Sequence, residues 1–389
     1  MNSIRVLVCG DYYPSHLVRD ELNNNRELFD YNFQRLLSSA DYSIVNLESP
    51  VFDNDSLSGI PKSGPLLHGY PEGVDYIKDM GFNMVTLANN HILDYGYKGL
   101  EKTLGYLKSK DLNYVGAGLD KDEVRAYRVI SVGDYSLGII NVCEHEFSVI
   151  DDCTFGANPL EISNVYYDIQ SLKSITDFII IIIHGGHEHY QLPSFRMKKT
   201  YRLFIDMGAD VVINGHQHCF SGYEKYNSKY VFYGLGNFLF NRLDDNKMIG
   251  TWNEGISILL SFKINKDRKE IGFGIYPYKQ CVGGVNFCLY QKDTTEHKKV
   301  DNKIQELNAI IDDDAKLKYE FEQMSYTRRY HYLMLLTQFR SRLLKGLCYR
   351  GLIPDFISSK RLLIAKNCIS CESHRDIFQE FINSKINIE

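Results

Sequence analysis

The sequence predicts an α/β protein, a layered sandwich whose strands deliver polar side chains to one edge of a sheet. Three observations predict this fold class. Short apolar runs alternate with stretches of helical periodicity through most of the chain. The run at residues 177–183 is apolar on both faces, as a central strand should be. Several runs end directly in acidic, amide or imidazole side chains, and ligands of open α/β sheets gather at such strand ends.

Length and composition are those of a globular protein with room for more than one core. The chain has 389 residues, of which 44% are hydrophobic and 24% charged. Its net charge of -5 gives no global attraction to nucleic acid, so we expect no nucleic-acid partner. A change in composition near residue 290 predicts two parts: a main α/β domain at 1–290 and a helical C-terminal extension at 291–389.

Cysteine usage and hydropathy predict a cytoplasmic protein. The nine cysteines are scattered rather than densely spaced, which is typical of reduced thiols. Cys368 and Cys371 form a lone C-x-x-C without a second pair, so we assign them no role, and Cys9 and Cys219 are expected to be small buried side chains. The first residues lack the pattern of a signal peptide, and no apolar run is long enough to span a bilayer.

The first part of the chain is predicted to contain three strands separated by helices. The strands lie at residues 4–9, 42–47 and 83–88, and the helices at 25–39, 72–81 and 99–110. Each strand leads into polar side chains, which are Asp11 for the first, Asn46 and Glu48 for the second, and Asn90, His91 and Asp94 for the third.

The second part adds further strands that end in histidines. We expect a strand at 114–118, a hairpin at 125–132 and 135–142, a helix at 194–207, strands at 177–183, 210–214 and 230–235, and an antiparallel pair at 255–264 and 270–278. The strand at 177–183 leads into His184, His187, Glu188 and His189, the next into His216 and His218, and the third into Asn237.

His216 and His218 are the first candidates for metal ligands. Residues i and i+2 of an extended segment point the same way, so a strand can aim both imidazoles at one point. A polar turn with two exposed histidines is the alternative. A set of Asp, Glu, Asn and His without thiolate suits a pair of Mn, Fe or Zn ions. Such a pair would generate a hydroxide nucleophile for a phosphoryl-like centre, and His91 could protonate the leaving group.

The ordered motifs resemble a known family. They are Gly10-Asp11, NLE at 46–48, ANNHILDYG at 88–96, HGGHE at 184–188, GHQH at 215–218 and GLGNF at 234–238. Together they resemble the bacterial capsule synthesis protein CapA family, which is associated with poly-γ-glutamate and other capsule production. Its fold is similar to that of the calcineurin-like metallophosphoesterases. The resemblance covers residues 4–285.

The resemblance implies a role for each motif residue. Glu48 takes the place of the carboxylate that bridges two ions, and His91 matches the leaving-group acid. The remaining ligands are Asp11 and His218 for the first metal, and Asn90, His184 and His216 for the second. Two positions depart from the pattern. Tyr13 stands where the phosphoesterases have a histidine, which leaves the first site one ligand short, and HGGHE lacks the usual tryptophan but offers His187 and His189 as replacement ligands.

Four residues near the motifs have two interpretations each. Asp94 is assigned to catalysis beside His91, with capping of a turn as the alternative. Asn237 contacts the site or ends a strand. Glu188 binds metal or orients His184, and orientation is the more usual role for a carboxylate near a ligating imidazole. Asn46 contacts substrate or satisfies loop backbone.

The C-terminal part is predicted to be helical and partly basic. Residues 325–366 carry nine Lys and Arg but one acid, Asp355. An apolar stripe of Tyr332, Leu336, Phe339, Leu343 and Leu347 predicts packing on the main domain. The basic side chains are either solvated or meet an anionic polymer, an anionic membrane at its inner face, or a capsule-assembly partner.

We therefore expect a metal-dependent hydrolase of capsule or exopolymer biosynthesis that attacks a phosphoester or related anionic bond. One alternative is a non-catalytic metal-binding or assembly component of a capsule-synthesis complex, consistent with Tyr13 and the altered HGGHE segment. Another is an amide hydrolase of a glutamyl polymer that uses the same nucleophile.

Overall fold

The computed structural model describes residues 3–53, 56–62, 64–150, 154–241, 250–266, 268–282, 284–336 and 341–353. The chain divides into two compact units, Met1–Leu317 and Lys318–Glu389. Residues 291–317, which the change in composition assigned to the C-terminal extension, lie in the first unit. Cys368 and Cys371 lie outside the described residues.

The first unit contains a sheet of eight strands. Their order is β16-β15-β14-β1-β2-β3-β4, with β13 also paired to β1. The pairs among β1, β2, β3, β4 and β13 are parallel, whereas β14, β15 and β16 join the sheet antiparallel. The strands are β1 (Ile4–Tyr13), β2 (Tyr42–Leu47), β3 (Met84–Thr86), β4 (Asn113–Val115), β13 (Asn237–Phe240), β14 (Glu254–Asn265), β15 (Arg268–Gln280) and β16 (Phe287–Leu289).

A second sheet has six strands in the order β11-β12-β10-β9-β7-β6. Its central strands β7, β9, β10 and β12 are parallel, and hairpins add β6 and β11 at the edges. The strands are β6 (Arg128–Val132), β7 (Tyr135–Cys143), β9 (Phe178–His184), β10 (Val211–Gly215), β11 (Tyr223–Tyr226) and β12 (Lys229–Phe232). A small ladder joins β5 (Ala117–Gly118) to β8 (Gly156–Ala157). Every residue of β9 is buried, as predicted for a central strand.

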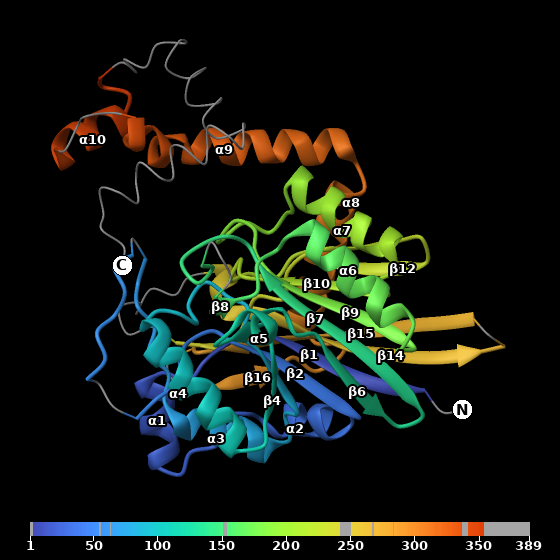
Figure 1. The fold of residues 1–389 in the computed structure, drawn as a ribbon. Coiled ribbons are helices and arrows are strands. Elements are labelled where there is room, and N and C mark those ends of the chain that lie inside the picture. Colours follow the sequence, from blue (N-terminus) through green and yellow to red (C-terminus); the bar gives the residue numbers. More distant parts are fainter. Residues whose placement is uncertain are drawn as a thin grey trace. The chain divides into compact units, whose positions relative to one another are not determined.

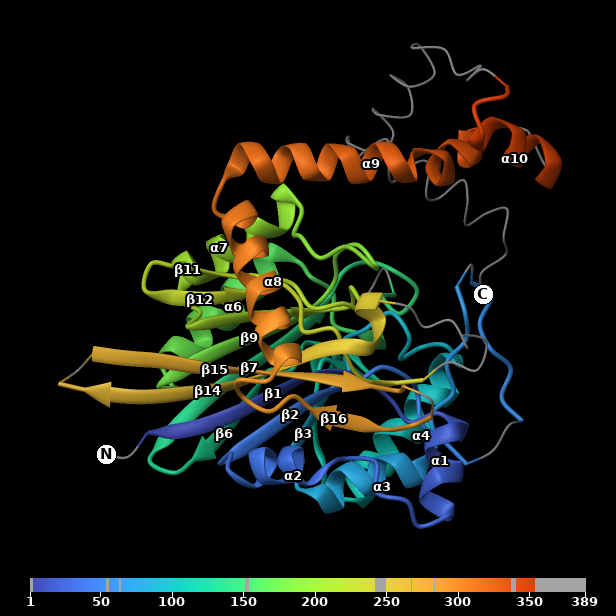
Figure 2. The same cartoon turned by 180° about the vertical axis from the view of Figure 1, so that it is seen from behind.

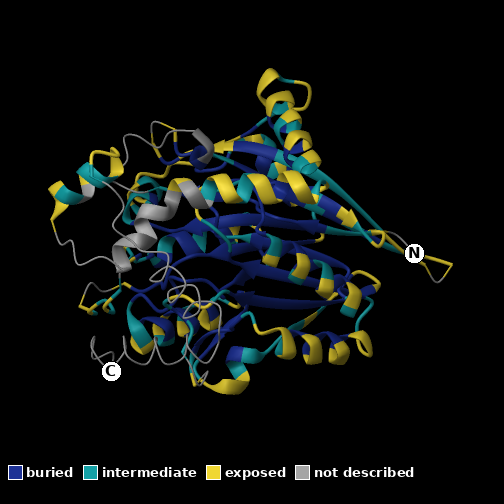
Figure 3. Ribbon diagram, turned by 90° about the horizontal axis from the view of Figure 1, so that it is seen from above, coloured by how far each residue is buried: buried dark blue, intermediate teal, exposed yellow. Residues whose placement is uncertain are grey.

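The two large sheets pack face to face, and helices cover their outer faces (Figures 1 and 2). Alternation along β1 shows why. Val6 and Val8 belong to the core that includes the second sheet, whereas Leu7 belongs to the core that includes α2, α3 and α4. Figure 3 shows the strands as the buried interior of this arrangement. The predicted layered α/β sandwich is confirmed.

Helices α1 to α4 flank the first sheet, and local capping sets their ends. They are α1 (His16–Asn23), α2 (Tyr31–Ser38), α3 (Pro71–Met80) and α4 (Gly96–Ser109). Helix α3 begins with Pro71 in its first turn and ends at Gly81, whose φ of 106° is the left-handed conformation that favours glycine. Helix α2 is shorter than predicted because Asp30 caps it, accepting a hydrogen bond from the Phe33 amide at 2.8 Å.

The predicted strand at 114–118 is interrupted. Gly116 has a φ of 98°, and a Cβ on it would lie 1.9 Å from Asn141 Oδ1, so the chain breaks there into β4 and β5. The same Asn141 oxygen accepts hydrogen bonds from the backbone amides of Leu87 and Ala88, at 3.1 and 2.8 Å. This contact fixes the segment that leads from β3 to Asn90 and His91.

The remaining helices of the first unit are α5 (Lys121–Arg125), α6 (Ile162–Lys173), α7 (Phe195–Met207) and α8 (Thr295–Ile311), with a 3-10 turn η1 (Gly250–Asn253). Helices α1, α5 and α6 and strands β8, β11, β13 and β16 were not predicted. Helix α8 packs on the unit through Val300, Ile304, Leu307 and Ile311, which recur at helical spacing and are all buried.

The chain continues through α9 (Asp314–Leu336) and α10 (Arg342–Tyr349). Of the predicted apolar stripe at residues 332–347, Leu343 is 76% exposed and Leu347 is intermediate in burial. Phe339 and the side chains of Tyr332 and Leu336 lie outside what the structure describes, so the packing of this stripe stays a prediction. Among the described helices, none combines the length and apolar composition needed to cross a bilayer.

Candidate metal centre

Five of the predicted strand-end side chains come together at one end of the two sheets. Asp11 lies near the end of β1, Glu48 follows β2, His184 ends β9, and His216 and His218 follow β10. Because β1 pairs parallel to β2, and β9 parallel to β10, the ends of each pair lie at the same edge. All five side chains are buried.

The five side chains form two overlapping sets that could each hold a metal ion. One set is Glu48, His184 and His216, and the other is Asp11, Glu48 and His218; within each set the ligand atoms lie within 4.8 Å of one another. Glu48 belongs to both, with Oε1 3.5 Å from His184 Nε2 and 3.8 Å from His218 Nε2. A carboxylate placed between two imidazoles in this way has the position of a bridging ligand.

Glu48 is the least satisfied of these groups. Its side chain is fully buried, and neither oxygen accepts a hydrogen bond from a donor in the described part of the chain. Burial, with repulsion from Glu188, raises the pKa of Glu48 well above its ordinary value; a proton shared with Asp11 would satisfy one oxygen at most. Burying an ionised carboxylate without a partner costs about several kcal/mol of desolvation free energy. A cation bound to the carboxylate removes that cost.

The three histidines are neutral imidazoles in this environment. Burial lowers the pKa of His184 to about 4 and that of His216 to about 3, and it lowers the pKa of His218 well below its ordinary value. A neutral imidazole offers a lone pair, so the site needs to lose no proton from these rings before it can bind a cation.

The side of the site that holds Asp11 has an aromatic residue where the resemblance calls for a histidine. The Tyr13 ring packs 5.2 Å from the Phe240 ring, in a buried cluster with Leu67 and Trp252. His218 is oriented there by Asn237, whose Oδ1 lies 2.8 Å from His218 Nδ1. Asn237 is therefore an orienting partner rather than a turn residue only.

Two asparagines support the centre. Asn46 Nδ2 donates to Asp11 Oδ1 at 2.8 Å, and Asn46 Oδ1 lies 3.3 Å from donors on Thr86 and Asn89. Asn46 thus holds a ligand in place, which neither of its two predicted roles described. Asn90 Oδ1 lies 3.1 Å from His184 Nε2, next to the first ligand set.

The GHQH segment reaches the site by a route that strand alternation does not predict. Strand β10 ends at Gly215, and His216 and His218 both have left-handed backbones, with φ of 87° and 55°. The alternation rule for extended chain therefore does not apply. The two rings enter different ligand sets, and backbone strain of this kind clusters at functional sites.

His91 and Asp94 form a buried pair beside the ligands. His91 Nδ1 lies 2.7 Å from Asp94 Oδ2. Burial lowers the pKa of His91 despite the hydrogen bond to Asp94. Asp94 also accepts from the Leu67 amide at 2.6 Å, so it supports His91 and secures a loop at the same time.

The HGGHE segment lies at the exposed side of the site. Half of the Glu188 side chain and of the His189 side chain is exposed, and the two are 3.9 Å apart; His187 is intermediate in burial. The His189 ring is 5.3 Å from Trp252, which is in turn 4.7 Å from the His218 ring. Neither His187 nor His189 belongs to the two ligand sets found within the described residues.

Sequence reasoning missed three contributors that lie far from the motifs. Trp252 supplies an aromatic wall beside His218. Glu144 is paired with Arg196 and accepts from the Gly186 amide at 3.1 Å, which fixes the turn after β9. Lys62 is buried against Asp94. The sequence marks Lys62 only by its place in a polar, Gly- and Pro-rich loop, a pattern typical of exposed lysines.

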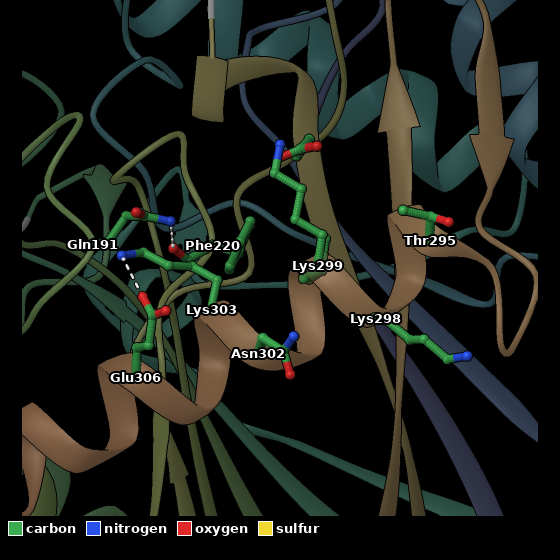
Figure 4. A pocket seen from close by; sticks show the side chains of 10 residues that line it. Gln191, Phe220, Thr295, Lys298, Lys299, Asn302, Lys303 and Glu306 are labelled. Carbon is green, nitrogen blue, oxygen red and sulfur yellow. Dashed lines mark hydrogen bonds and ion pairs between the residues drawn. The ribbon is translucent and has the colours of Figure 1, made fainter.

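A separate cavity of about 690 Å³ lies between α8 and the loops that follow the ligand segments. Gln191 and Phe220, a few residues beyond His189 and His218, line one side, and Gln191 Nε2 donates to the Phe220 carbonyl at 3.0 Å. Figure 4 shows Lys298, Lys299 and Lys303 of α8 along the other side.

The fold and this centre define a class: an α/β sandwich that presents two overlapping sets of metal-ligating side chains at its strand ends. The chain belongs to the bacterial capsule synthesis protein PGA_cap family, whose model matches residues 5–242. The expected family is thereby confirmed.

The chain aligns with only part of the length of two relatives named for capsule biosynthesis. The chain is 31% identical over 219 residues to the PGA biosynthesis protein CapA of Bacillus subtilis (strain 168), which covers 55% of this chain and 57% of that protein. It is 30% identical over 256 residues to the capsule biosynthesis protein CapA of Bacillus anthracis, with 61% and 60% covered. The chain thus spans less than two thirds of the length of these relatives.

Two solved structures also align with it. A hypothetical protein from Thermus thermophilus does so with a TM-score of 0.43 and 13% identity, covering 70% of this chain and 99% of that one. A 5'-nucleotidase from Candida albicans has a TM-score of 0.39 and 12% identity, covering 69% and 50%.

Proposed function

We propose that this protein is a metal-dependent hydrolase that acts on a phosphoester or a related anionic bond in capsule or exopolymer production. The observation that carries the proposal is the placement of Glu48. It is fully buried, shared by two ligand sets, and without a donor for either oxygen among the described residues. Two cations would satisfy it, whereas a purely structural carboxylate would have hydrogen bonds.

The donor set fits divalent Mn, Fe or Zn, because it offers carboxylate, amide and imidazole groups without thiolate. Asp11 and His218 would hold one ion, and His184 and His216, with Asn90 beside them, would hold the other. When bound, such a pair supplies Lewis acidity and a nucleophile derived from water at neutral pH. The chain itself supplies orientation through Asn46 and Asn237, and the other side chains keep bulk water from the buried ligands.

His91 is the group that we assign to proton transfer. Its Nδ1 is engaged by Asp94, which leaves Nε2 for a reacting group. His91 is close enough to the ligand histidines to contribute to the lowered pKa of His184 and His216. A positioned proton-transfer group of this kind contributes about 10²–10⁴-fold to turnover.

The family and the names of its relatives support the capsule part of the proposal. The two CapA proteins are named for capsule or PGA biosynthesis, and a further relative from Mycobacterium tuberculosis is named a probable polyglutamine synthesis accessory protein. An acidic polymer is therefore the partner that we propose. Lys298 and Lys299 along the cavity beside α8, and the basic residues at 325–366, suit an anionic ligand.

A non-catalytic metal-binding role in capsule assembly is the second candidate. The position of Tyr13 favours it, because its aromatic ring occupies the Asp11 side of the site where a further imidazole ligand was expected. In that case one ion would be bound and no hydrolysis would follow.

Metal content and hydrolysis together test the proposal. We expect the purified protein, after loading with Mn or Zn, to hold about two ions, and a His216→Ala/His218→Ala variant to lose most of them. His297→Ala on α8 is the matched control, since His297 pairs with Asp301 away from the centre. Equal metal content in all three proteins would exclude the site.

Hydrolysis of bis(4-nitrophenyl) phosphate and of polyglutamate separates the candidate activities. The proposed hydrolase cleaves the phosphodiester, and His91→Ala lowers its turnover by about 10²-fold or more with unchanged metal content. Cleavage of polyglutamate alone would identify the amide hydrolase instead. Bound metal with neither activity would support the non-catalytic candidate.

A further inference from the structure

Lys62 is a buried lysine in a part of the chain where a lysine is unexpected. It lies in the long loop between β2 and α3, yet its side chain is 1% exposed. Its ammonium contacts Asp94 Oδ1, and Asp94 is itself fully buried. The Lys62 nitrogen also lies 3.2 Å from His91 Nδ1 and 4.7 Å from the centre of the Phe147 ring. The ammonium of Lys62 thus points at the pair formed by Asp94 and His91.

Burying this charge is costly, and the loop is tied to Asp94 without it. Desolvation of an ammonium costs about several kcal/mol, which only an ion pair of good geometry can offset. The Ile60 amide donates to the Asp94 carbonyl at 2.9 Å, and the Leu67 amide donates to Asp94 Oδ2 at 2.6 Å. A neutral side chain at residue 62 would leave these loop contacts in place. Fastening the loop therefore does not explain the ammonium.

The proton arrangement at His91 gives the ammonium a function. His91 Nδ1 is 2.7 Å from Asp94 Oδ2, and an ionised carboxylate only accepts, so Nδ1 must carry the hydrogen. An ammonium only donates, so Lys62 cannot bond to a protonated Nδ1 and directs its hydrogen to Asp94 Oδ1. Lys62 thereby supplies the positive charge that pairs with Asp94 while His91 stays neutral.

We propose that Lys62 is a positioning residue for His91 and acts through Asp94. By supplying the counter-charge to Asp94, it fixes the imidazole as the tautomer with hydrogen on Nδ1, which leaves the lone pair on Nε2, the ring nitrogen that does not contact Asp94. The pair Lys198 and Asp314 is the structural counterexample. Lys198 is also buried, but its ammonium contacts the Ile311 carbonyl at the end of α8 and Asp314 at the start of α9.

The tautomer can be read directly, whether or not the protein is an enzyme. The full-length, metal-free protein is labelled with ¹⁵N-histidine, and long-range ¹H–¹⁵N spectra report which ring nitrogen of each histidine carries the hydrogen, with His91→Gln assigning the signal. We expect the Nδ1–H pattern for His91 in the wild type. In Lys62→Met the buried Asp94 carboxylate lacks its counter-charge, so it should bind the proton itself and donate it to Nδ1, which gives a mixed or reversed pattern. Lys198→Met, which removes another buried lysine, should leave the His91 signals unchanged.

Two further variants keep the test decisive. Lys62→Arg retains the charge and should retain the Nδ1–H pattern, even if Lys62→Met folds poorly. In an Asp94→Asn background, Lys62→Met should cause little additional change, because residues that act through one another are not additive. An unchanged His91 pattern in Lys62→Met, or equal changes in Lys62→Met and Lys198→Met, would overturn the proposal.

The effect on turnover rests on the proposed hydrolase. With bis(4-nitrophenyl) phosphate, Lys62→Met should lower kcat by about 10–100-fold, as loss of an outer partner does, with KM and metal content nearly unchanged. If the loaded wild type hydrolyses nothing, the proposed function fails, while the spectra still decide the role of Lys62. If the wild type is active and Lys62→Met keeps its kcat, the positioning role fails alone.

Discussion

Asp11 illustrates how a single ligand can oppose folding while it serves a site. Burial, with repulsion from Glu48, raises the pKa of Asp11 from 3.8 to about 7. Its native state therefore binds the proton more tightly than the unfolded chain does. The contribution of this group to stability is fully present below about pH 4 and is lost as the pH rises through about 7.

The first prediction follows for Asp11→Asn. In metal-free protein, the free energy of unfolding should fall between pH 4 and pH 8 by about 2–4 kcal/mol more in the wild type than in the variant. Urea unfolding at several pH values measures this. The exposed Asp206→Asn should follow the wild-type profile, and a wild-type profile for Asp11→Asn would refute the assignment.

Gly116 is the residue on which the segment before His91 depends. Its φ of 98° is unfavourable for other residues, and a Cβ there would lie 1.9 Å from Asn141 Oδ1 and 2.8 Å from the Ala88 amide nitrogen. Neither neighbour can move freely, because Asn141 is hydrogen-bonded to that same backbone.

We therefore predict that Gly116→Ala lowers the free energy of unfolding by about 2 kcal/mol or more, since it combines backbone strain with a clash. Gly105→Ala is the matched control: Gly105 lies in α4 with an ordinary φ and open space around its Cβ position. That change should stabilise the protein by about 0.5–1 kcal/mol. Thermal or urea unfolding would show whether the two changes have opposite signs.

At the scale of elements, Asp30 joins a helix to a strand that is distant in sequence. Its Oδ1 accepts from the Phe33 amide and caps α2, and its Oδ2 accepts from the Leu289 amide of β16, both at 2.8 Å. Phe33 and Phe287 pack together with ring centres 4.7 Å apart. The cap therefore also determines where the edge strand attaches.

Asp30→Ala should accordingly cost more than loss of a cap alone. We expect about 2–3 kcal/mol, the sum of a helix cap near 1 kcal/mol and an unsatisfied strand amide. Thr294→Ala removes the cap of α8, where Thr294 accepts from the His297 amide at 3.3 Å, together with an exposed hydrogen bond to the Gln291 carbonyl at 2.8 Å. It leaves no buried strand amide unsatisfied and should cost about 1 kcal/mol. Equal costs for the two variants would mean that the contact with β16 contributes nothing.

At the scale of the whole molecule, the first compact unit ends after α8. Val300, Ile304, Leu307 and Ile311 are buried in its core, and the Tyr223 amide donates to Asn308 of the same helix at 2.7 Å. Burying four such side chains contributes on the order of 5–10 kcal/mol. Helix α8 is thus part of the domain that carries the metal centre.

A truncation series tests this. A chain of residues 1–317 should keep the melting temperature and metal content of the full-length protein, whereas 1–290 should unfold at much lower temperature or aggregate. The same series locates the surface that binds an anionic partner, measured as salt-sensitive binding to polyglutamate or to anionic vesicles. If the basic segment mediates this binding, deletion of residues 318–389 should abolish it. If the α8 cavity mediates it, the shorter chain should still bind. Stable folding of 1–290 would contradict the role of α8.

The sequence by itself determined the fold class, most of the strands and the family. Apolar runs such as 177–183 and the periodicity of 99–110 are local signals, and the structure confirms both as β9 and α4. The candidate ligands were also predictable, because Asp11, Glu48 and the histidines each follow a recognisable strand, and parallel strands end at a common edge.

Only the tertiary structure decided how these residues are combined. Glu48 lies between two ligand sets, and Asn46 holds Asp11 in place; both depend on contacts between distant segments. His216 and His218 belong to different sets because their backbones are left-handed. Lys62 shows the reason most clearly. No local pattern distinguishes it from a solvated loop lysine, because its role depends on Asp94, which lies 32 residues away and is brought beside it only when the loop folds over the site.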